Sequence, residues 1–186
     1  MRPFVRLVAV VGLLGMFVIS DAFLYLALLD RNDVLARFFP LLPVATALVY
    51  VLLSVPLGRR ADVWGRVPVF LAGYVLLVGA YAAAQLAPAG VVAALVTVCL
   101  LGGYYAATDG VVTAAVAAMV PAHVRASGIA ALQTVMALAA LVSSVAFGFL
   151  VTYLTWGAAV MVMTVGVVVA VAVGCAILLP RQGAVS

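Results

Sequence analysis

Lysine and glutamate are absent from this 186-residue chain, and charged residues of all kinds make up only 8% of it. A soluble domain is about one quarter charged and about half apolar, whereas 69% of these residues are hydrophobic. No soluble core could bury so much apolar surface, so a water-soluble domain is excluded and the lipid bilayer is the expected surrounding. A membrane helix takes about 20 residues, which leaves room for about six spans joined by short loops.

Histidine and cysteine are scarce as well. The single histidine, His123, excludes a histidine metal cluster, and the sequence predicts no cofactor. Cys99 and Cys175 both lie inside apolar runs, where a cysteine behaves as a small apolar residue. The formal charge of +4 does not indicate nucleic-acid binding, because the arginines recur at alternate helix ends instead of forming one patch.

Six apolar segments follow one another, and we expect each to be a transmembrane helix. Their approximate limits are 4–29, 36–57, 67–86, 91–120, 127–154 and 157–179. The first run is longer than the apolar core of a signal peptide, which makes a cleaved leader the weaker alternative. Between the first two segments, Arg37 follows Asp33 by four residues, a helical spacing that would let the two charges pair.

Arginine distribution predicts the orientation of these spans. With the N-terminus inside, seven arginines lie on the inner side (Arg2, Arg6, Arg59, Arg60, Arg66, Arg125 and Arg181) and two, Arg31 and Arg37, lie outside. Positive charge favours the cytoplasmic side. The sequence therefore predicts a multi-pass protein of the cell (inner) membrane with both termini in the cytoplasm.

A faint internal repeat divides the chain near its middle. Asp21 is matched by Asp109 at an offset of 88 residues, Arg37 by Arg125 at the same offset, and Gly58 by Gly148 at an offset of 90. We interpret the chain as one six-helix transmembrane domain, residues 1–186, built from two three-helix units at about 1–88 and 89–186. An odd number of spans in each unit would insert the copies in opposite directions, as in many transporters, although chance matching in so alanine-rich a chain is an alternative.

One segment concentrates charge: Gly58-Arg59-Arg60-Ala61-Asp62-Val63-Trp64-Gly65-Arg66. We expect it to be a cytoplasmic loop that begins at Pro56 and ends at Val67. Asp62 could accept backbone N–H bonds at a helix N-terminus, and the neighbouring arginines could reach it or lipid phosphates. Gly58, without a side chain, would let another helix approach.

This segment resembles the signature loop of the major facilitator superfamily, Gly-x-Leu-Ala-Asp-Arg-x-Gly-Arg-Arg. Gly58, Ala61, Asp62, Gly65 and Arg66 match, whereas Arg60, Val63 and Val67 depart from the pattern. Asp109-Gly110 followed by Pro121-x-x-x-Arg125-Ala-Ser-Gly128 is similar to a second pattern of that family. The resemblance covers the whole chain, but only as one six-helix, C-terminal-type half of a transporter.

The resemblance implies an all-α membrane fold and secondary transport of small organic molecules, in particular proton-coupled efflux. It implies that the basic loop, with Arg125, latches one conformation, and a generic positively charged turn is the alternative. Because a rocking mechanism needs two halves, it implies a homodimer or a partner that supplies a second six-helix half.

Two acids lie inside predicted spans. Asp21 shares a helical face with Tyr25, and Asp109 shares one with Tyr105 and Thr113. An intramembrane carboxylate usually faces a cavity or a partner, and burial favours the protonated form of a carboxyl group. Both acids are therefore candidates for proton coupling or substrate binding, and a structural hydrogen bond between helices is the alternative for each.

Other residues and other functions carry weaker signals. Gln133 and Thr134 could face the transport path, although an interhelical hydrogen bond explains them equally well. Two membrane aspartates also suggest an intramembrane aspartyl protease, but the residues before Asp109 depart from the Gly-x-Gly-Asp motif of those enzymes. The sequence therefore predicts a transporter and not an enzyme, with a truncated or non-transporting membrane subunit as the alternative.

Overall fold

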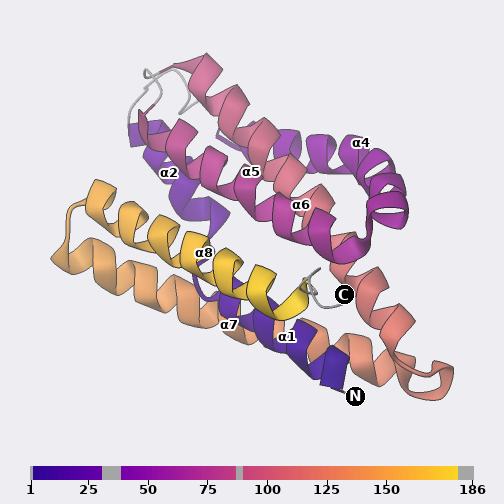
Figure 1. The fold of residues 1–186 in the computed structure, drawn as a ribbon. Coiled ribbons are helices and arrows are strands. Elements are labelled where there is room, and N and C mark those ends of the chain that lie inside the picture. Colours follow the sequence, from indigo (N-terminus) through magenta and orange to yellow (C-terminus); the bar gives the residue numbers. More distant parts are fainter. Residues whose placement is uncertain (1, 31–38, 87–89, 180–186) are drawn as a thin grey trace, which may run out of the picture.

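The computed structural model of the chain describes residues 2–30, 39–86 and 90–179. Within these ranges every regular element is a helix, and Figure 1 shows the helices running roughly along one common direction. Their bounds are α1 Arg2–Gly15, α2 Asp21–Asp30, α4 Leu41–Trp64, α5 Arg66–Leu86, α6 Val91–Met119, η1 Ala122–Val124, α7 Arg125–Tyr153 and α8 Trp156–Leu178. The predicted pair between Asp33 and Arg37 lies outside the described residues.

Five of these helices, α4 to α8, are long and apolar enough to cross a membrane. They coincide, within a few residues at most ends, with the second to sixth predicted spans. This agreement is expected, because uninterrupted apolar runs of about 20 residues specify membrane helices almost by length alone. The two inverted three-helix units stay a prediction.

The first predicted span is wrong as a single helix. α1 ends at Gly15 and α2 begins at Asp21, so five residues, 16–20, separate two short helices. The local sequence accounts for both boundaries, since glycine is frequent at helix ends and serine followed by aspartate is favoured at helix starts. The backbone N–H groups of Phe23 and Leu24 both donate to the Ser20 carbonyl and so open α2.

The predicted basic loop is also wrong. α4 continues through Pro56 to Trp64 and α5 begins at Arg66, so Gly65 alone separates them. Gly65 has a φ of 97°, a left-handed conformation that glycine adopts without strain. One glycine is thus enough to reverse the chain, and no loop is needed. Arg59 and Arg60 consequently lie on the last turns of α4.

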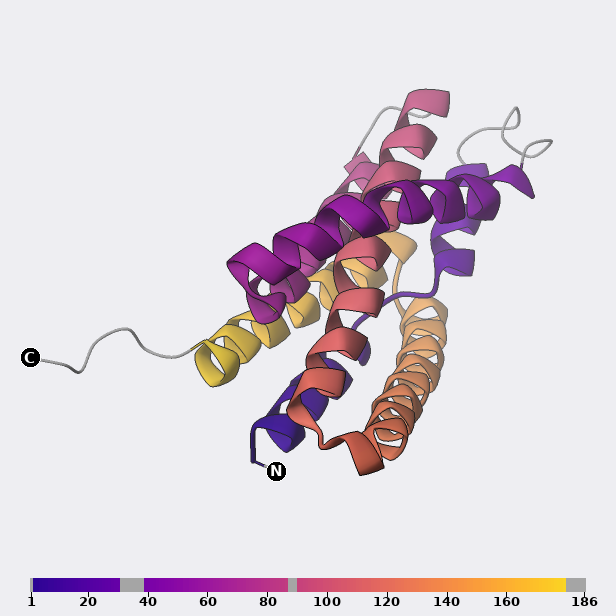
Figure 2. The same ribbon diagram turned by 90° about the vertical axis from the view of Figure 1, so that its right-hand side faces the viewer.

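The helix ends gather into two groups, and Figures 1 and 2 agree on this arrangement. The start of α1, the Gly65 turn, η1 and the end of α8 lie at one end of the bundle. The α7–α8 turn and the end of α2 lie at the other. The α4–α5 turn, η1 and the two ends of the described chain thus share one side of the bundle. The assignment of that side to the cytoplasm stays a prediction.

α6 lies at the centre of the packing. It contacts α4, α5, α7 and α1, while α5 and α8 pack against each other behind it. At Gly102 the α4 backbone comes so close that a Cβ atom would lie 2.6 Å from the Cβ of Val49 and 2.9 Å from the Thr46 carbonyl oxygen. Gly102 therefore sets the separation of α4 and α6, two helices whose side chains also line the cavities between them.

A matched pair of substitutions on α6 tests this close approach. We predict that Gly102→Ala lowers the free energy of unfolding by about 1–3 kcal/mol, because the added methyl group must push α4 away. Gly110→Ala is the control, since no atom lies within 4 Å of the point where its Cβ would stand and alanine favours the helix by about 0.5–1 kcal/mol. Thermal unfolding in mild detergent measures both, and equal stability of the two variants would contradict the close approach.

Candidate functional site

The break between α1 and α2 interrupts a helix in a region that lipid should surround. Three N–H groups, of Met16, Phe17 and Val18, still bond back to carbonyls of α1, at 3.1–3.3 Å. Within the described chain, the N–H of Ile19 and the carbonyl of Val18 have no backbone hydrogen-bond partner. In a bilayer such groups must find partners within the protein.

Two side chains from other helices supply those partners. The backbone N–H of Ile19 donates to the Tyr81 hydroxyl of α5 at 2.7 Å, and the Ser143 hydroxyl of α7 donates to the Val18 carbonyl at 2.6 Å. Ile19, Tyr81 and Ser143 are all buried. The broken segment is therefore held between α5 and α7, and this fixes where α2 and its first residue begin.

Asp21 stands at that first position of α2, beside the break. Its Oδ1 accepts a hydrogen bond of 2.8 Å from the Tyr105 hydroxyl of α6. One turn further along α2, the Tyr25 hydroxyl lies 2.8 Å from the Thr46 hydroxyl of α4, and either group can be the donor. α2 is thus tied by polar side chains to both α6 and α4.

Two adjoining cavities meet at this point. The larger, of about 390 Å³, lies between the break, α5, α6 and α7, and the smaller, of about 220 Å³, lies between α2, α4 and α6. Asp21, Tyr105 and Asp109 line both of them. The two predicted intramembrane acids, 88 positions apart in the sequence, therefore face one polar space.

The two acids differ in their surroundings. Asp21 is held by Tyr105, whereas no described residue donates a hydrogen bond to Asp109 or pairs with it. Neither cavity is lined by an arginine or a histidine among the residues that the structure describes. The space consequently carries up to two negative charges with no cation beside them in the described chain.

Tyrosines form much of the wall. Tyr74 and Tyr104 meet edge to face with ring centroids 5.3 Å apart, and Tyr104 and Tyr105 lie 5.1 Å apart. These rings extend the lining from α5 across α6. The site therefore combines apolar aromatic surface with two carboxyl groups, a composition suited to a small organic molecule.

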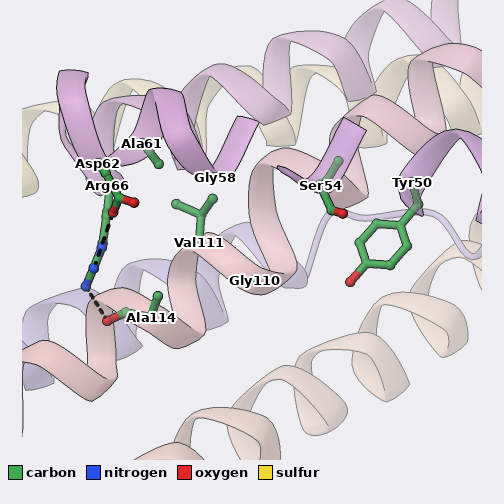
Figure 3. Close-up of a pocket in the computed structure, with 10 residues that line it drawn as sticks. Tyr50, Ser54, Gly58, Ala61, Asp62, Arg66, Gly110, Val111 and Ala114 are labelled. Carbon is green, nitrogen blue, oxygen red and sulfur yellow. Dashed lines mark hydrogen bonds and ion pairs between the residues drawn. The ribbon is translucent and has the colours of Figure 1, made fainter. Parts of the chain in front are cut away.

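A third cavity, of about 300 Å³, lies further along α4 and α6 and shares Tyr50 with the smaller cavity. Figure 3 shows its walls, with Tyr50 and Ser54 toward one end and Asp62 and Arg66 toward the other. Gly58 and Gly110 both lie along it, and no atom lies within 4 Å of where a Cβ would stand at either. The expected closure of a helix onto Gly58 is therefore not present in this conformation.

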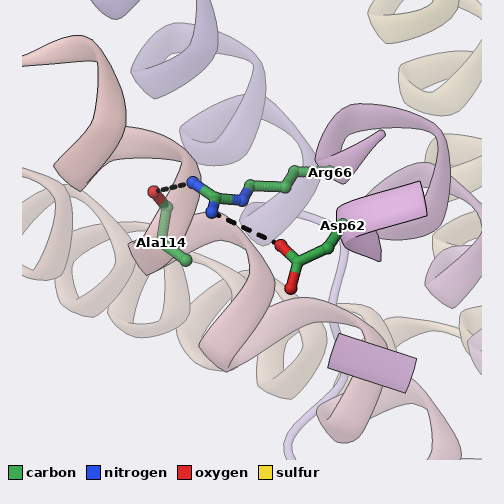
Figure 4. A network of polar contacts seen from close by, with 3 residues as sticks. All are labelled: Asp62, Arg66 and Ala114. Carbon is green, nitrogen blue, oxygen red and sulfur yellow. Dashed lines mark hydrogen bonds and ion pairs between the residues drawn. The ribbon is translucent and has the colours of Figure 1, made fainter. Parts of the chain in front are cut away.

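An arginine closes the far end of that cavity. Arg66 donates through Nη1 to the Ala114 carbonyl of α6 at 2.6 Å, and its Nη2 lies 3.4 Å from Asp62 Oδ1 of α4 (Figure 4). The prediction that Asp62 accepts backbone N–H bonds at a helix start is wrong, because Asp62 lies in the last turn of α4. Arg66 thus ties three helices, α4, α5 and α6, together at one point.

The remaining predicted residues do not join these contacts. Arg59 and Arg60 are exposed and have no ion pair in the part of the chain described, so of the three arginines expected to reach Asp62 only Arg66 does. Arg125 begins α7 and is exposed. Gln133 is exposed and lines none of the three cavities, although it precedes Met136, Ala140 and Ser144, which line the largest, at helical spacing.

Sequence reasoning missed several lining residues. Tyr50 lines two cavities and Tyr74 lines one, yet the sequence pattern marked neither as a site residue. The sequence pattern did not mark Tyr81 either, although its hydroxyl accepts the hydrogen bond from the Ile19 N–H at the break. The seven-residue spacing of Tyr74 and Tyr81, two turns along one face of α5, was the available signal.

The long apolar helices and the acid-lined cavities between them define a multi-pass membrane protein of the transporter type. Comparison with protein families gives the identity within that class: the family model described as Major Facilitator Superfamily matches residues 7–185. The chain therefore belongs to the major facilitator superfamily, whose members are membrane transporters and not enzymes. Comparison with curated proteins and with solved structures produced no match.

The hydrogen bond from the Ile19 N–H to Tyr81 can be tested by removing the Tyr81 hydroxyl. We predict that Tyr81→Phe lowers the free energy of unfolding by about 1–2 kcal/mol, because the buried N–H of Ile19 loses its hydrogen-bond acceptor. Tyr153→Phe is the control, since Tyr153 is 79% exposed and its change should stay within about 0.5 kcal/mol. Unfolding in detergent measures both, and a Tyr81→Phe variant as stable as the control would contradict the role of the hydroxyl.

Proposed function

We propose that this chain is half of a secondary active transporter that couples proton movement to the export of a small organic molecule. The observation that carries the proposal is the shared space lined by Asp21 and Asp109, one from a half-helix at a break and one from the central helix α6. Intramembrane carboxyl groups that face a cavity are typical of proton relays. Broken helices that line a cavity are typical of transporter binding sites.

The unequal surroundings of the two acids suggest a division of roles. Asp109 has no hydrogen-bond partner among the described residues, so it can take up or release a proton without breaking a bond within them. When Asp21 gains or loses a proton, its hydrogen bond to Tyr105 must either be kept or be rearranged. We assign the coupling proton chiefly to Asp109, and the placing of substrate against the tyrosine wall chiefly to Asp21 and Tyr105.

The charge of the cavity restricts the substrate. Two carboxyl groups without a neighbouring cation among the described lining residues repel an anion. A neutral or cationic molecule with an apolar body fits the tyrosine-rich walls better. Proton uptake at either acid would weaken the hold on a cation, which is the competition that exchange of a proton for a substrate requires.

Arg66 is the proposed latch of this conformation. Its bonds to Asp62 and Ala114 hold α4, α5 and α6 together beside the third cavity. The ion pair is weak enough to be exchanged, since it is 3.4 Å long and Asp62 is 67% exposed. Movement of α4 relative to α6 would break the latch and change the width of the cavity that contains Gly58 and Gly110.

The exposed faces support a half-transporter. The helices α4 and α7 flank the acid-lined space. In the most apolar 18-residue stretch of each helix, only 11% of the residues of α4 and 17% of those of α7 are buried, against 50% for α5 and 61% for α6. A second six-helix half on this side, either another copy of the chain or a separate protein, would cover both helices and enclose the cavities. We place both termini in the cytoplasm of the cell, on the arginine-rich side.

Gradient-driven flux in vesicles tests the coupling. We predict that Asp109→Asn abolishes transport driven by a proton gradient while leaving exchange of substrate across the membrane, because the amide cannot release a proton. We expect Asp21→Asn to weaken substrate binding as well, since the amide changes the group that Tyr105 bonds. A fluorescent organic cation and an anion of similar size serve as the two probes.

The control for both is Asp62→Asn, which removes the same charge outside the acid-lined cavities. It should leave substrate binding unchanged, whatever it does to the rate of transport. Full gradient-driven activity in both Asp21→Asn and Asp109→Asn would end the coupling proposal, and preference for the anion would end the assignment of substrate charge.

Site-directed crosslinking tests the two-half arrangement. In a variant with Cys99 and Cys175 replaced, a cysteine at exposed Leu141 of α7 should crosslink to a second copy or to another membrane protein, because the proposed interface covers α7. A cysteine at Val75 of α5, which is 66% exposed, is the control and should stay uncrosslinked. A stable monomer without crosslinks or flux would favour the truncated or non-transporting subunit.

A further inference from the structure

The outer flank of α4 borders an apolar groove that is separate from the acid-lined cavities and from the third cavity. It has a volume of about 350 Å³ and lies between the last turns of α4 and the first half of α5, over Ala107 of α6. Ser54, Gly58, Ala61 and Asp62 of α4 line the polar third cavity, whereas a different stripe of the same helix lines this recess. The two spaces therefore open on opposite flanks of α4.

Its walls are apolar. Leu57 and Trp64 of α4 face Val69, Ala72 and Leu76 of α5, each set spaced at one to two helical turns. Trp64 is 68% exposed and Ala72 is exposed, so the recess is an open groove and not a sealed void. On a membrane-embedded hairpin such a groove opens toward lipid chains.

A single charged residue, Arg60, lines the groove at its α4 side among the described residues. Its guanidinium carbon lies over the Trp64 ring, 5.6 Å from the ring centroid, within the range of a cation–π interaction. Asp62, the one acid nearby in the described chain, is already paired with Arg66. The N–H donors of Arg60 consequently have no anionic partner in the part of the protein that the structure describes.

From these features we propose that the groove binds one phospholipid with an anionic headgroup. An acyl chain would lie along Leu57, Ala72 and Leu76. The phosphate of the headgroup, whose negative charge no headgroup ammonium offsets, would accept hydrogen bonds from Arg60, whose fork geometry matches a pair of phosphate oxygens. Arginine and tryptophan are both suited to the level of the headgroups. Arginine clusters on the cytoplasmic side attract anionic lipids, and Arg59, which is exposed beside Arg60, adds only to the surrounding potential.

The tryptophans of the chain offer a direct test. The sequence holds two, Trp64 and Trp156, so Trp156→Phe leaves a single fluorophore in the groove wall. This variant is reconstituted in bilayers of zwitterionic phosphatidylcholine that contain a small fraction of phosphatidylglycerol with brominated chains. We expect brominated phosphatidylglycerol to quench Trp64 more strongly than the same fraction of brominated phosphatidylcholine does.

Three substitutions in that background separate a site from a charged surface, and a fourth checks the donor geometry. Arg60→Ala should lower the apparent affinity for the brominated phosphatidylglycerol about fivefold, since one basic residue contributes about 1 kcal/mol to binding an anionic lipid. Arg59→Ala removes the same charge from a residue that does not line the groove and should have a much smaller effect. Ala72→Phe should abolish the preference by filling the groove without adding a second tryptophan, and Arg60→Lys should retain the preference only in part.

Equal losses in Arg59→Ala and Arg60→Ala would show a diffuse attraction to the basic helix end and overturn the proposal. Equal quenching by the two brominated lipids would overturn it too. Absence of quenching by either lipid would mean that protein covers the groove, which also overturns it. Because quenching needs no gradient and no substrate, these outcomes are independent of the transport assays.

Discussion

Backbone N–H and C=O groups inside a bilayer cannot be left without hydrogen bonds, and this constraint shapes the region on which the site depends. The chain breaks its first apolar segment at residues 16–20, and it can do so because Tyr81 and Ser143 accept and donate the bonds that the helix gives up. The break turns Asp21 into the first residue of a separate helix. A continuous helix would satisfy the backbone equally well, but it would not begin α2 beside Tyr105 of α6.

α6 connects the acid-lined cavities with the contacts of Arg66. One face of it carries Tyr105 and Asp109 beside the acid-lined cavities, and further along the Ala114 carbonyl receives Arg66. Gly102 allows α4 to lie against it at close range. Since α4 carries Thr46 and Tyr50 of the smaller cavity and Asp62 of the proposed latch, a single movement of α4 over α6 would change both regions.

The residues of α4 that line the third cavity and those that line the apolar groove lie on separate stripes of the helix. The stripe that contains Ser54 and Gly58 faces the interior path, and the stripe that contains Leu57, Arg60 and Trp64 faces outward. Because residues three or four apart share a helical face, one short basic segment can serve both sides once it is helical. The same residues in an irregular loop would have no such division.

Sequence patterns alone were enough to predict the lipid surroundings, the helical class, five of the spans and the resemblance to the superfamily that the family comparison confirms. These follow from local quantities: the length of an apolar run, the scarcity of charge and the spacing of a short motif. It also singled out Asp21 and Asp109, because a carboxyl group in an apolar run is costly wherever it lies. The folded structure was needed to show that the first span is broken, that the basic segment is helical, and that Arg66, and not Arg59 or Arg60, meets Asp62. The break and the arginine depend on partners distant in the sequence: Tyr81 and Ser143 for the break, and the Ala114 carbonyl for the arginine. Local pattern cannot supply such pairings, since many residues in an apolar chain are equally able to form them until packing brings particular ones together.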